Sequence, residues 1–223
     1  MADVPDAQTR IILRPIGSPL PLGFFAFAVG VAMTSLLSLD VFPQQDARQV
    51  AVILVAFTGP LEALAAVFAF LGRDVGSGTA FSILGGSWVL TGLSMLSAAP
   101  GARSPVLSAF DFVLALILLL LAGSAIAGKP ALGILLVASG VRFVLSGLQQ
   151  LSGQVTLAHW SGIIGLVIAA VGLYGGLATI LEDSRGRLVL PTGRRGRARE
   201  SLEEGLDAQL AGVQSEAGVR NQL

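Results

Sequence analysis

Six long apolar stretches constrain this chain more than any other feature of its sequence. They cover about residues 21–42, 50–71, 79–98, 105–127, 131–150 and 159–181, and each is bounded by charge, proline or glycine. A helix needs about 20 mostly apolar residues to cross the roughly 30 Å hydrocarbon core of a bilayer. Only 13% of the residues are charged, about half the share in a soluble domain. The sequence predicts an all-α integral membrane protein with a bundle of six transmembrane helices.

Positive charge is divided unequally between the two sides of the predicted bundle. With six spans, both termini and the second and fourth loops share one side. That side carries Arg10, Arg14, Arg73, Lys129, Arg185, Arg187, Arg194, Arg195, Arg197 and Arg199. The opposite side has only Arg48 and Arg103. Because Lys and Arg favour cytoplasmic loops, we expect a multi-pass protein of the plasma (inner) membrane with both termini cytoplasmic.

The expected organisation has three parts. Residues 1–20 form a cytoplasmic N-terminal segment that lacks the apolar core of a cleavable signal peptide. Residues 21–181 form the six-helix domain, and residues 182–223 form a charged cytoplasmic tail. In the tail, Leu202, Leu206 and Leu210 recur every four residues, which permits a short amphipathic helix on anionic lipid. A flexible tail that only sets the topology is the favoured interpretation.

Glycines recur at seven-residue steps inside three of the spans. They are Gly85 and Gly92, then Gly133, Gly140 and Gly147, and finally Gly165 and Gly172. Seven residues make nearly two helical turns, so each set forms a smooth stripe that lets another helix backbone approach closely. The stripes predict a tight bundle and are compatible with a homo-oligomer.

The residues that most enzymes and metal sites need are scarce. There is no cysteine and one histidine, His159, so neither a thiolate nor a histidine cluster can hold a metal. We expect no metal, no cofactor and no nucleic-acid partner, and no nucleophile and base point to an enzyme. His159 lies near the outer start of the sixth span, where an interfacial ring is the ordinary interpretation.

Two charges fall near the middle of their spans, Glu62 in the second and Arg142 in the fifth. A lone charge at the bilayer centre costs at least about 2.5–3.5 kcal/mol, so each needs a partner or water. One interpretation is a structural Glu62–Arg142 ion pair, within a subunit or across an interface. The other is a proton-titrating glutamate and an anion-attracting arginine beside a pore. The sequence leaves both open.

The starts of the first and third spans contain unusual residues. Ser18 is placed to cap the first helix with Pro19 at its first position, and the exposed N–H groups there would suit a carboxylate. The third span opens with small, polar and aromatic residues from Thr79 to Trp88. These residues either line a solute path or serve close helix packing.

Three separated segments resemble the acetate uptake transporter family, the YaaH-like succinate and acetate permeases. Residues 18–24, S-P-L-P-L-G-F, resemble the family's N-P-A-P-L-G-L. Residues 79–88, T-A-F-S-I-L-G-G-S-W, resemble T-A-F-T-S-Y-G-S-F-W, and residues 186–193 resemble G-R-x-V-L-P-x-G. The resemblance covers about residues 16–193. It implies a six-helix protomer, a ring-like homohexamer with a pore through each protomer, and movement of small monocarboxylates or succinate, commonly with protons.

The resemblance also assigns positions and marks departures. Phe27 matches an aromatic that narrows the pore, Leu84 replaces a tyrosine, and Arg142 stands where relatives tend to carry an apolar residue. Glu62 falls near a position where they tend to carry glutamine. The expected substrate path consists of Ser18, Pro19, Pro21, Gly23, Phe24, Phe27, Thr79, Phe81, Ser82, Leu84 and Trp88, with Glu62 and Arg142 for proton coupling or charge compensation.

The function expected from these features is a channel or transporter for small carboxylates, acetate or succinate, linked to protons. A desolvated carboxylate without partners faces a barrier of several kcal/mol, so permeation as the neutral acid is physically attractive. A channel for a neutral solute such as urea, ammonia or a short amide is the main alternative, because Leu84 makes the path less polar. A non-transporting scaffold or sensor that acts through the tail is a third.

Overall fold

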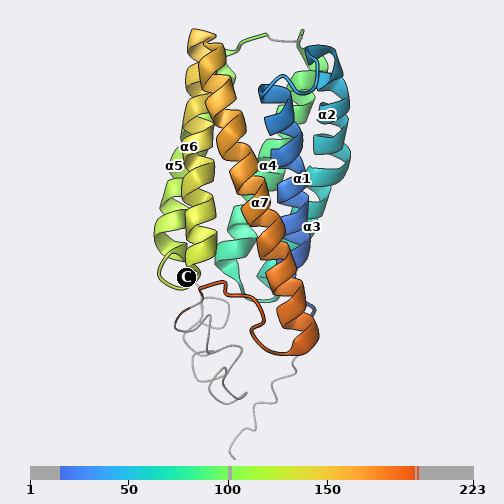
Figure 1. The fold of residues 1–223 in the computed structure, drawn as a ribbon, viewed down its shortest axis with the longest axis vertical. Coiled ribbons are helices and arrows are strands. Elements are labelled where there is room, and N and C mark those ends of the chain that lie inside the picture. Colours follow the sequence, from blue (N-terminus) through green and yellow to red (C-terminus); the bar gives the residue numbers. More distant parts are fainter. Residues whose placement is uncertain (1–15, 100–101, 194, 196–223) are drawn as a thin grey trace, which may run out of the picture.

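Six long helical segments run up and down in the computed structural model of the chain, which describes residues 16–99, 102–193 and 195 (Figure 1). Each segment is long and apolar enough to cross a membrane, so the expected six-span all-α bundle is confirmed. In chain order the elements are α1 (Leu20–Ser38), η1 (Gln44–Asp46), α2 (Ala47–Ile53), η2 (Leu54–Thr58), α3 (Gly59–Leu71), α4 (Val75–Ser97), α5 (Pro105–Ala125), α6 (Pro130–Ser152) and α7 (Val155–Arg185). The second span is the continuous run from η1 to α3. We call the end at which α1 begins and α7 ends the proximal end, and the opposite end the distal end.

The ends of α1 differ from the expectation. No side chain caps its start, so the predicted Ser18 cap is wrong: Pro19 occupies the cap position with helical backbone angles of −77° and −12°. The helix stops at Ser38, short of residue 42, because Asp40 takes a left-handed φ of 55°. The Val41 N–H then bonds back to the Leu36 carbonyl at 3.0 Å, which is the closure expected at a helix C-terminus.

The second span changes its helical pitch midway. Residues Leu54–Thr58 form a π-helical turn in which the Gly59 N–H reaches the Leu54 carbonyl. Pro60 follows directly in the first turn of α3. Proline has no N–H to donate and its ring crowds the preceding turn, so the wider π-helical turn lets the helix continue past Pro60. Such turns are frequent at functional sites.

The glycine stripes lie at the closest helix contacts. A Cβ built on Gly92 would lie 2.8 Å from the Ala51 carbonyl of α2, and one on Gly85 would lie 3.2 Å from the Gly59 carbonyl of α3. On α6, Gly140 faces Leu119 of α5 at 3.1 Å, and on α7, Gly172 faces Ala28 of α1 at 3.2 Å. The prediction that these stripes allow tight packing is therefore confirmed.

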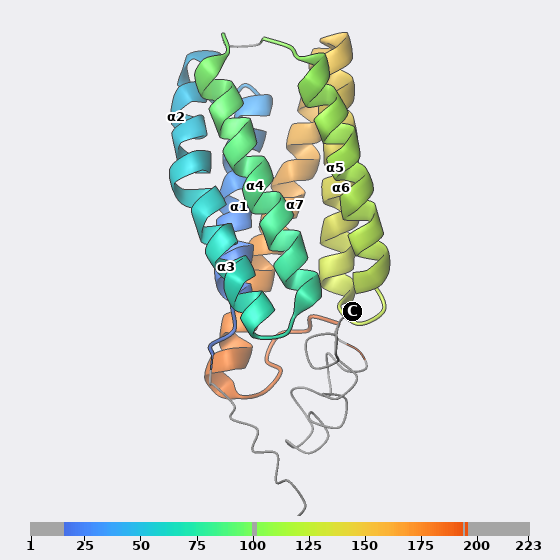
Figure 2. The same ribbon diagram turned by 180° about the vertical axis from the view of Figure 1, so that it is seen from behind.

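Three helix pairs make most of the contacts: α5 with α6, α1 with α7, and α3 with α4. The pair α6 and α7 joins two of these units, whereas α4 and α5 touch only sparsely (Figure 2). Beyond α7, Gly186 takes a left-handed φ of 60°, and the Tyr174 hydroxyl donates to the Pro191 carbonyl at 3.0 Å. The helix thus runs past the expected limit at residue 181. Leu202, Leu206 and Leu210 lie outside the described residues, as does most of the segment 1–20.

We expect alanine at Gly92 to destabilise the fold and alanine at Gly86 to leave it intact. The Cβ of Gly92→Ala meets a backbone oxygen, and overpacking of this kind costs about 1–3 kcal/mol. Gly86 lies on the same helix with nothing within 4 Å of an added Cβ. The measurement is the temperature at which the detergent-purified protein loses its monodisperse elution peak. Equal stability of the two variants would contradict the packing described.

Asp74 links α4 to α6 at the proximal end. Its Oδ1 accepts from the Ser77 N–H at 3.2 Å and caps α4, and its Oδ2 pairs with the Lys129 ammonium. Burial alone would raise the pKa of Asp74, but the Lys129 charge and the hydrogen bonds from Lys129 and Ser77 outweigh it and lower the pKa below its ordinary 3.8.

Replacing Asp74 by asparagine should lower stability in a pH-dependent way. Asparagine keeps the cap but loses the ion pair, which for a partly exposed pair is worth about 0.5–1 kcal/mol. The folded pKa lies below the unfolded one, so the Asp74 contribution is present above 3.8 and is lost as the pH falls through the folded pKa. Thermal unfolding should therefore separate wild type from D74N at pH 7, and the difference should shrink as the pH is lowered below 3.8. A constant difference would contradict this assignment.

Candidate functional site

A vestibule of about 790 Å³ opens in the distal half of the bundle. All six spans contribute to its lining, α1, α4, α5, α6 and α7 with their distal halves and the second span with its first turns. The deeper lining consists of Thr34, Trp88, Thr91, Phe110, Asp111, Arg142, Phe143, Ser146 and Ser161. The cavity therefore extends from the distal end to side chains near the middle of their helices.

Arg142 lies at the floor of this vestibule, where it is only 9% exposed. Its Nε donates to the Ser161 carbonyl of α7 at 3.2 Å, and one Nη2 hydrogen goes to the Thr34 hydroxyl of α1 at 2.9 Å. A guanidinium has five N–H donors, so three remain without a partner among the described residues. The two bonds fix the orientation of the side chain and leave donors for an incoming molecule.

Asp111 of α5 supplies the opposite charge at the same floor. It is 8% exposed, and one oxygen accepts from the Ser146 hydroxyl at 2.7 Å. Asp111 and Arg142 attract each other electrostatically. Within the described part of the chain, however, they share neither a hydrogen bond nor a contact ion pair.

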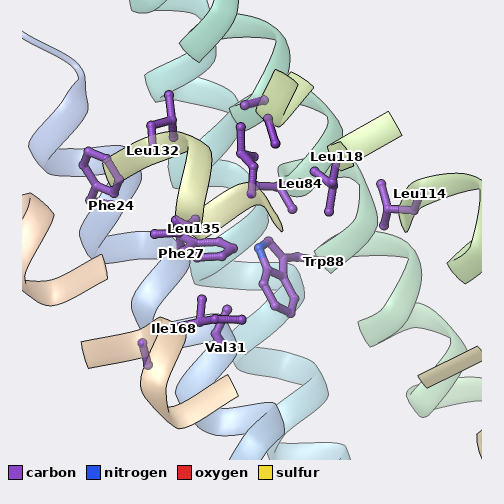
Figure 3. Close-up of a cluster of buried hydrophobic side chains, with 14 of the residues drawn as sticks. Phe24, Phe27, Val31, Leu84, Trp88, Leu114, Leu118, Leu132, Leu135 and Ile168 are labelled. Carbon is purple, nitrogen blue, oxygen red and sulfur yellow. The ribbon is translucent and has the colours of Figure 1, made fainter. Parts of the chain in front are cut away.

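An apolar plug closes the vestibule on the side of the proximal end. It is built by Phe27, Leu84 and Trp88, each at most 3% exposed. The rings of Phe27 and Trp88 lie 6.2 Å apart, and Figure 3 shows them side by side with Leu84 next to them. Trp88 lines the vestibule, whereas Phe27 and Leu84 do not. Trp88 is therefore the member of the plug that the vestibule reaches, and Phe27 and Leu84 lie behind it.

Glu62 lies behind this plug and is completely buried. Its Oε1 accepts from the Trp88 indole N–H at 3.0 Å, and its Oε2 has no partner in the described structure. Four residues earlier in the same span, at the end of the π-helical turn, the buried Thr58 hydroxyl also lacks a partner there. A buried carboxylate oxygen without a hydrogen bond is unfavourable, so this position is a candidate for proton binding.

The structure does not pair Glu62 with Arg142 within one chain. Trp88 is the hydrogen-bond partner of Glu62, and Thr34 and Ser161 are those of Arg142, within the described residues. The two charges occupy similar depths, but α3 packs on α4 and α1, whereas α6 packs on α5 and α7. A structural ion pair between them inside a subunit is thus corrected to two separate sites.

The remaining expected path residues cluster toward the proximal end. Phe24 and Phe81 meet edge to face with ring centres 6.1 Å apart, and Gly23 has no side chain at the place where the Phe81 ring lies. The structure therefore brings together the first and second segments that carry the family resemblance. Pro19, Pro21 and Thr79 are half-buried, and Ser18 and Ser82 are exposed on the single chain. The role of all these residues in a path stays a prediction.

At the distal rim, His159 contacts Asp40 at 3.2 Å, and Gln44 donates to the other Asp40 oxygen at 3.2 Å. These hydrogen bonds, that of His159 first, lower the pKa of Asp40 below its ordinary 3.8. Asp40 lines the vestibule, whereas His159 does not. Within the residues described, no group of three His, Cys, Asp or Glu side chains is placed to hold a metal.

Comparison with known proteins places the chain in a family. The sequence model of the GPR1/FUN34/yaaH family matches residues 4–194. The chain belongs to this family. The resemblance inferred from the three segments is therefore confirmed.

Two proteins illustrate the likeness of this family member. The solved structure described as the bacterial acetate channel SatP superposes with a TM-score of 0.72 at 23% identity, covering 80% of this chain and 100% of that chain. An uncharacterized protein of Methanothermobacter thermautotrophicus is 23% identical over 197 residues, 83% of this chain and 96% of its own length. At this identity the structural match establishes the shared fold.

Sequence reasoning missed Asp111 as the counterpart of Arg142 in this family member. Asp111 lies 14 residues before the end of α5 at Ala125, and Arg142 lies 12 residues after the start of α6 at Pro130. In an antiparallel helical hairpin with a short turn, such residues come to nearly the same depth, within about 3 Å at 1.5 Å per residue. Similar distance from the turn between the two helices was the usable signal. No sequence signal marked the other residues around these charges, Thr34, Ser146 and Ser161, because hydroxyl residues are common in transmembrane spans.

We expect glutamine at Glu62 to be tolerated and leucine to destabilise the protein. Glutamine keeps an oxygen for the Trp88 N–H, whereas leucine leaves that buried donor unpaired at a cost of about 1–3 kcal/mol. Thermal unfolding in detergent measures both. The double variant Glu62→Leu with Trp88→Phe removes donor and acceptor together, so its loss should be smaller than the sum of the single losses. Strict additivity would rule out the Trp88–Glu62 bond.

Proposed function

We propose that this chain is a membrane channel or transporter for small carboxylates, with acetate as the first candidate and succinate as the second. Membership of the GPR1/FUN34/yaaH family supports this proposal, as does the fold shared with a protein described as an acetate channel. The known chemistry of the site residues supports a binding and conducting role, not an enzymatic one. The substrate would move through each protomer.

The observation that carries the proposal is the vestibule that ends on Arg142. Its guanidinium is held by Thr34 and Ser161 and keeps three N–H donors for a solute. Guanidinium groups recognise carboxylates through paired N–H donors, and a charged group inside a span is by default a functional candidate. Because all six spans of one chain line this vestibule, a path within each protomer of a ring-like homohexamer is the arrangement we favour.

The proposed path continues from Arg142 through the plug to the proximal end. Phe27, Leu84 and Trp88 separate the vestibule from the aromatic pair Phe24 and Phe81. A small solute passes there only if these side chains rotate, and it must shed its water to do so. Apolar constrictions of this kind select small solutes and gate by excluding water.

Proton linkage is the second part of the proposal. Glu62 has one free oxygen directly behind Trp88, so its protonation state can act on the residue that closes the vestibule. The described cations of the proximal end, Arg73, Lys129, Arg185, Arg187 and Arg195, outnumber Arg48 and Arg103 at the distal end. By the positive-inside rule the proximal end and both termini are cytoplasmic in the plasma (inner) membrane, and the vestibule opens outward.

Replacing Arg142 by methionine should abolish most acetate uptake. The variant loses the donors for the substrate, and a hydrogen bond to a charged group is worth about 1.5–3 kcal/mol, or roughly a tenfold to hundredfold fall in rate. Radiolabelled acetate uptake into proteoliposomes, with an inward proton gradient and with empty liposomes as the baseline, measures this. Uptake by the wild-type protein no faster than by empty liposomes would contradict the proposed function.

Arg48→Met is the matched control. Arg48 is an exposed arginine at the distal end that does not line the vestibule, so its loss removes the same charge without touching the floor. It should leave uptake within about twofold of the wild type. Uptake by Arg142→Met equal to that of Arg48→Met, with both proteins monodisperse, would exclude Arg142 from the path.

A further inference from the structure

The charges that line the vestibule balance each other. In the described lining they are Asp40 and Arg103 near the rim and Asp111 and Arg142 at the floor, two negative and two positive. Around them, His159 faces Asp40, and Glu62 reaches the lining only through Trp88. A cleft concentrates anions when the charges of its lining are predominantly positive. This lining carries both signs, so it gives an anion no net attraction.

The two floor charges face the same cavity without touching. Each is anchored elsewhere, Arg142 by Thr34 and Ser161 and Asp111 by Ser146. Opposite charges attract each other more strongly as they approach, but these two do not form a contact pair within the described structure. Both residues line the cavity, Arg142 with N–H donors and Asp111 with a carboxylate oxygen that have no hydrogen-bond partner among the described residues.

We propose that Arg142 and Asp111 form a two-point binding site for a neutral solute with a carbonyl acceptor beside an O–H or N–H donor. The carbonyl oxygen accepts from the Arg142 guanidinium, and the O–H or N–H donates to the free Asp111 oxygen. Protonated short carboxylic acids and short primary carboxamides both have this pattern. A carboxylate anion lacks the donor and would place its charge against Asp111.

This inference rests on the proposed function for its physiological substrate and adds to it. The acid is bound together with its proton, so binding at the floor is electrically neutral. It also assigns a further ligand class, the primary amides, which have no proton to titrate in the ordinary range. The two classes can therefore be separated by pH.

The fluorescence of Trp88 can report on binding at the floor of the vestibule. The chain has two tryptophans, Trp88 in the vestibule lining and Trp160 on the surface, 56% exposed. In a Trp160→Phe background, Trp88 is the only tryptophan, and its emission reports on occupancy of the floor. Isobutyramide and N,N-dimethylacetamide are constitutional isomers, and only the first has N–H donors. They are matched probes for the proposed contact with Asp111.

We expect isobutyramide to change Trp88 emission saturably, with the same half-saturating concentration at pH 7.5 and pH 8.5. N,N-dimethylacetamide should need at least about a tenfold higher concentration, because it leaves a charged acceptor unpaired. For acetate, the half-saturating total concentration should rise about tenfold for each pH unit above the pKa of the acid, because the neutral fraction falls tenfold. Equal binding of the isomers, or acetate binding that does not change with pH, would overturn the proposal.

Asp111→Asn tests the residue itself. Removing the negative charge should weaken isobutyramide binding and strengthen acetate binding at pH 7.5, whereas a merely structural role would change both in one direction. Asp40→Asn removes a carboxylate from the rim and should change the binding of neither isobutyramide nor acetate. If isobutyramide binds as described but proteoliposomes take up no acetate, the proposed function fails and the site stands. If acetate is taken up and isobutyramide does not bind, the site fails and the proposed function stands.

Discussion

The placement of one guanidinium inside an apolar bundle depends on close helix packing. Arg142 extends from α6 to a hydroxyl on α1 and a carbonyl on α7, so three helices must converge on it. Gly165 makes this possible: a Cβ there would lie 2.7 Å from the Arg142 Nε and would collide with Ser35. In lipid, helices gain little from hydrophobic burial and associate through such small residues and interhelical hydrogen bonds. The glycine stripe of α7 therefore both packs the bundle and leaves room for the charge.

The plug and the vestibule share one residue, and this couples the two halves of the molecule. Trp88 lines the vestibule with one part of its indole and donates to Glu62 with its N–H. Glu62 itself follows the π-helical turn that precedes Pro60. A change of hydrogen bonding at Glu62 would therefore act on the ring that closes the vestibule, and the span that carries Glu62 is already locally widened at this turn. This arrangement offers a physical route by which a proton could influence the passage of a solute.

Several parts of this structure were predictable from the sequence because they follow from local rules. Hydrophobic length predicted the six spans, and the seven-residue glycine spacing predicted which helix faces pack closely. Asp111 was not predicted as the counterpart of Arg142, because the prediction compared depth alone and so favoured Glu62, whereas α5 and α6 are neighbours as the two arms of a hairpin. The vestibule also escaped prediction, since it is formed by residues from all six spans that are individually ordinary. The cap at Ser18 failed because Pro19 already adopts helical angles.

In the proposed path, solutes enter through the distal vestibule, and the accessibility of single cysteines measures this entry. The natural chain has no cysteine, so Ser94→Cys on the vestibule wall and Ser97→Cys, one turn further along α4 and outside the lining, each introduce a single thiol. Both proteins are treated in proteoliposomes with a charged, membrane-impermeant thiol reagent, and labelling and acetate uptake are then measured. We expect labelled Ser94→Cys to lose uptake and labelled Ser97→Cys to keep it. Full labelling of Ser94→Cys with undiminished uptake would contradict it.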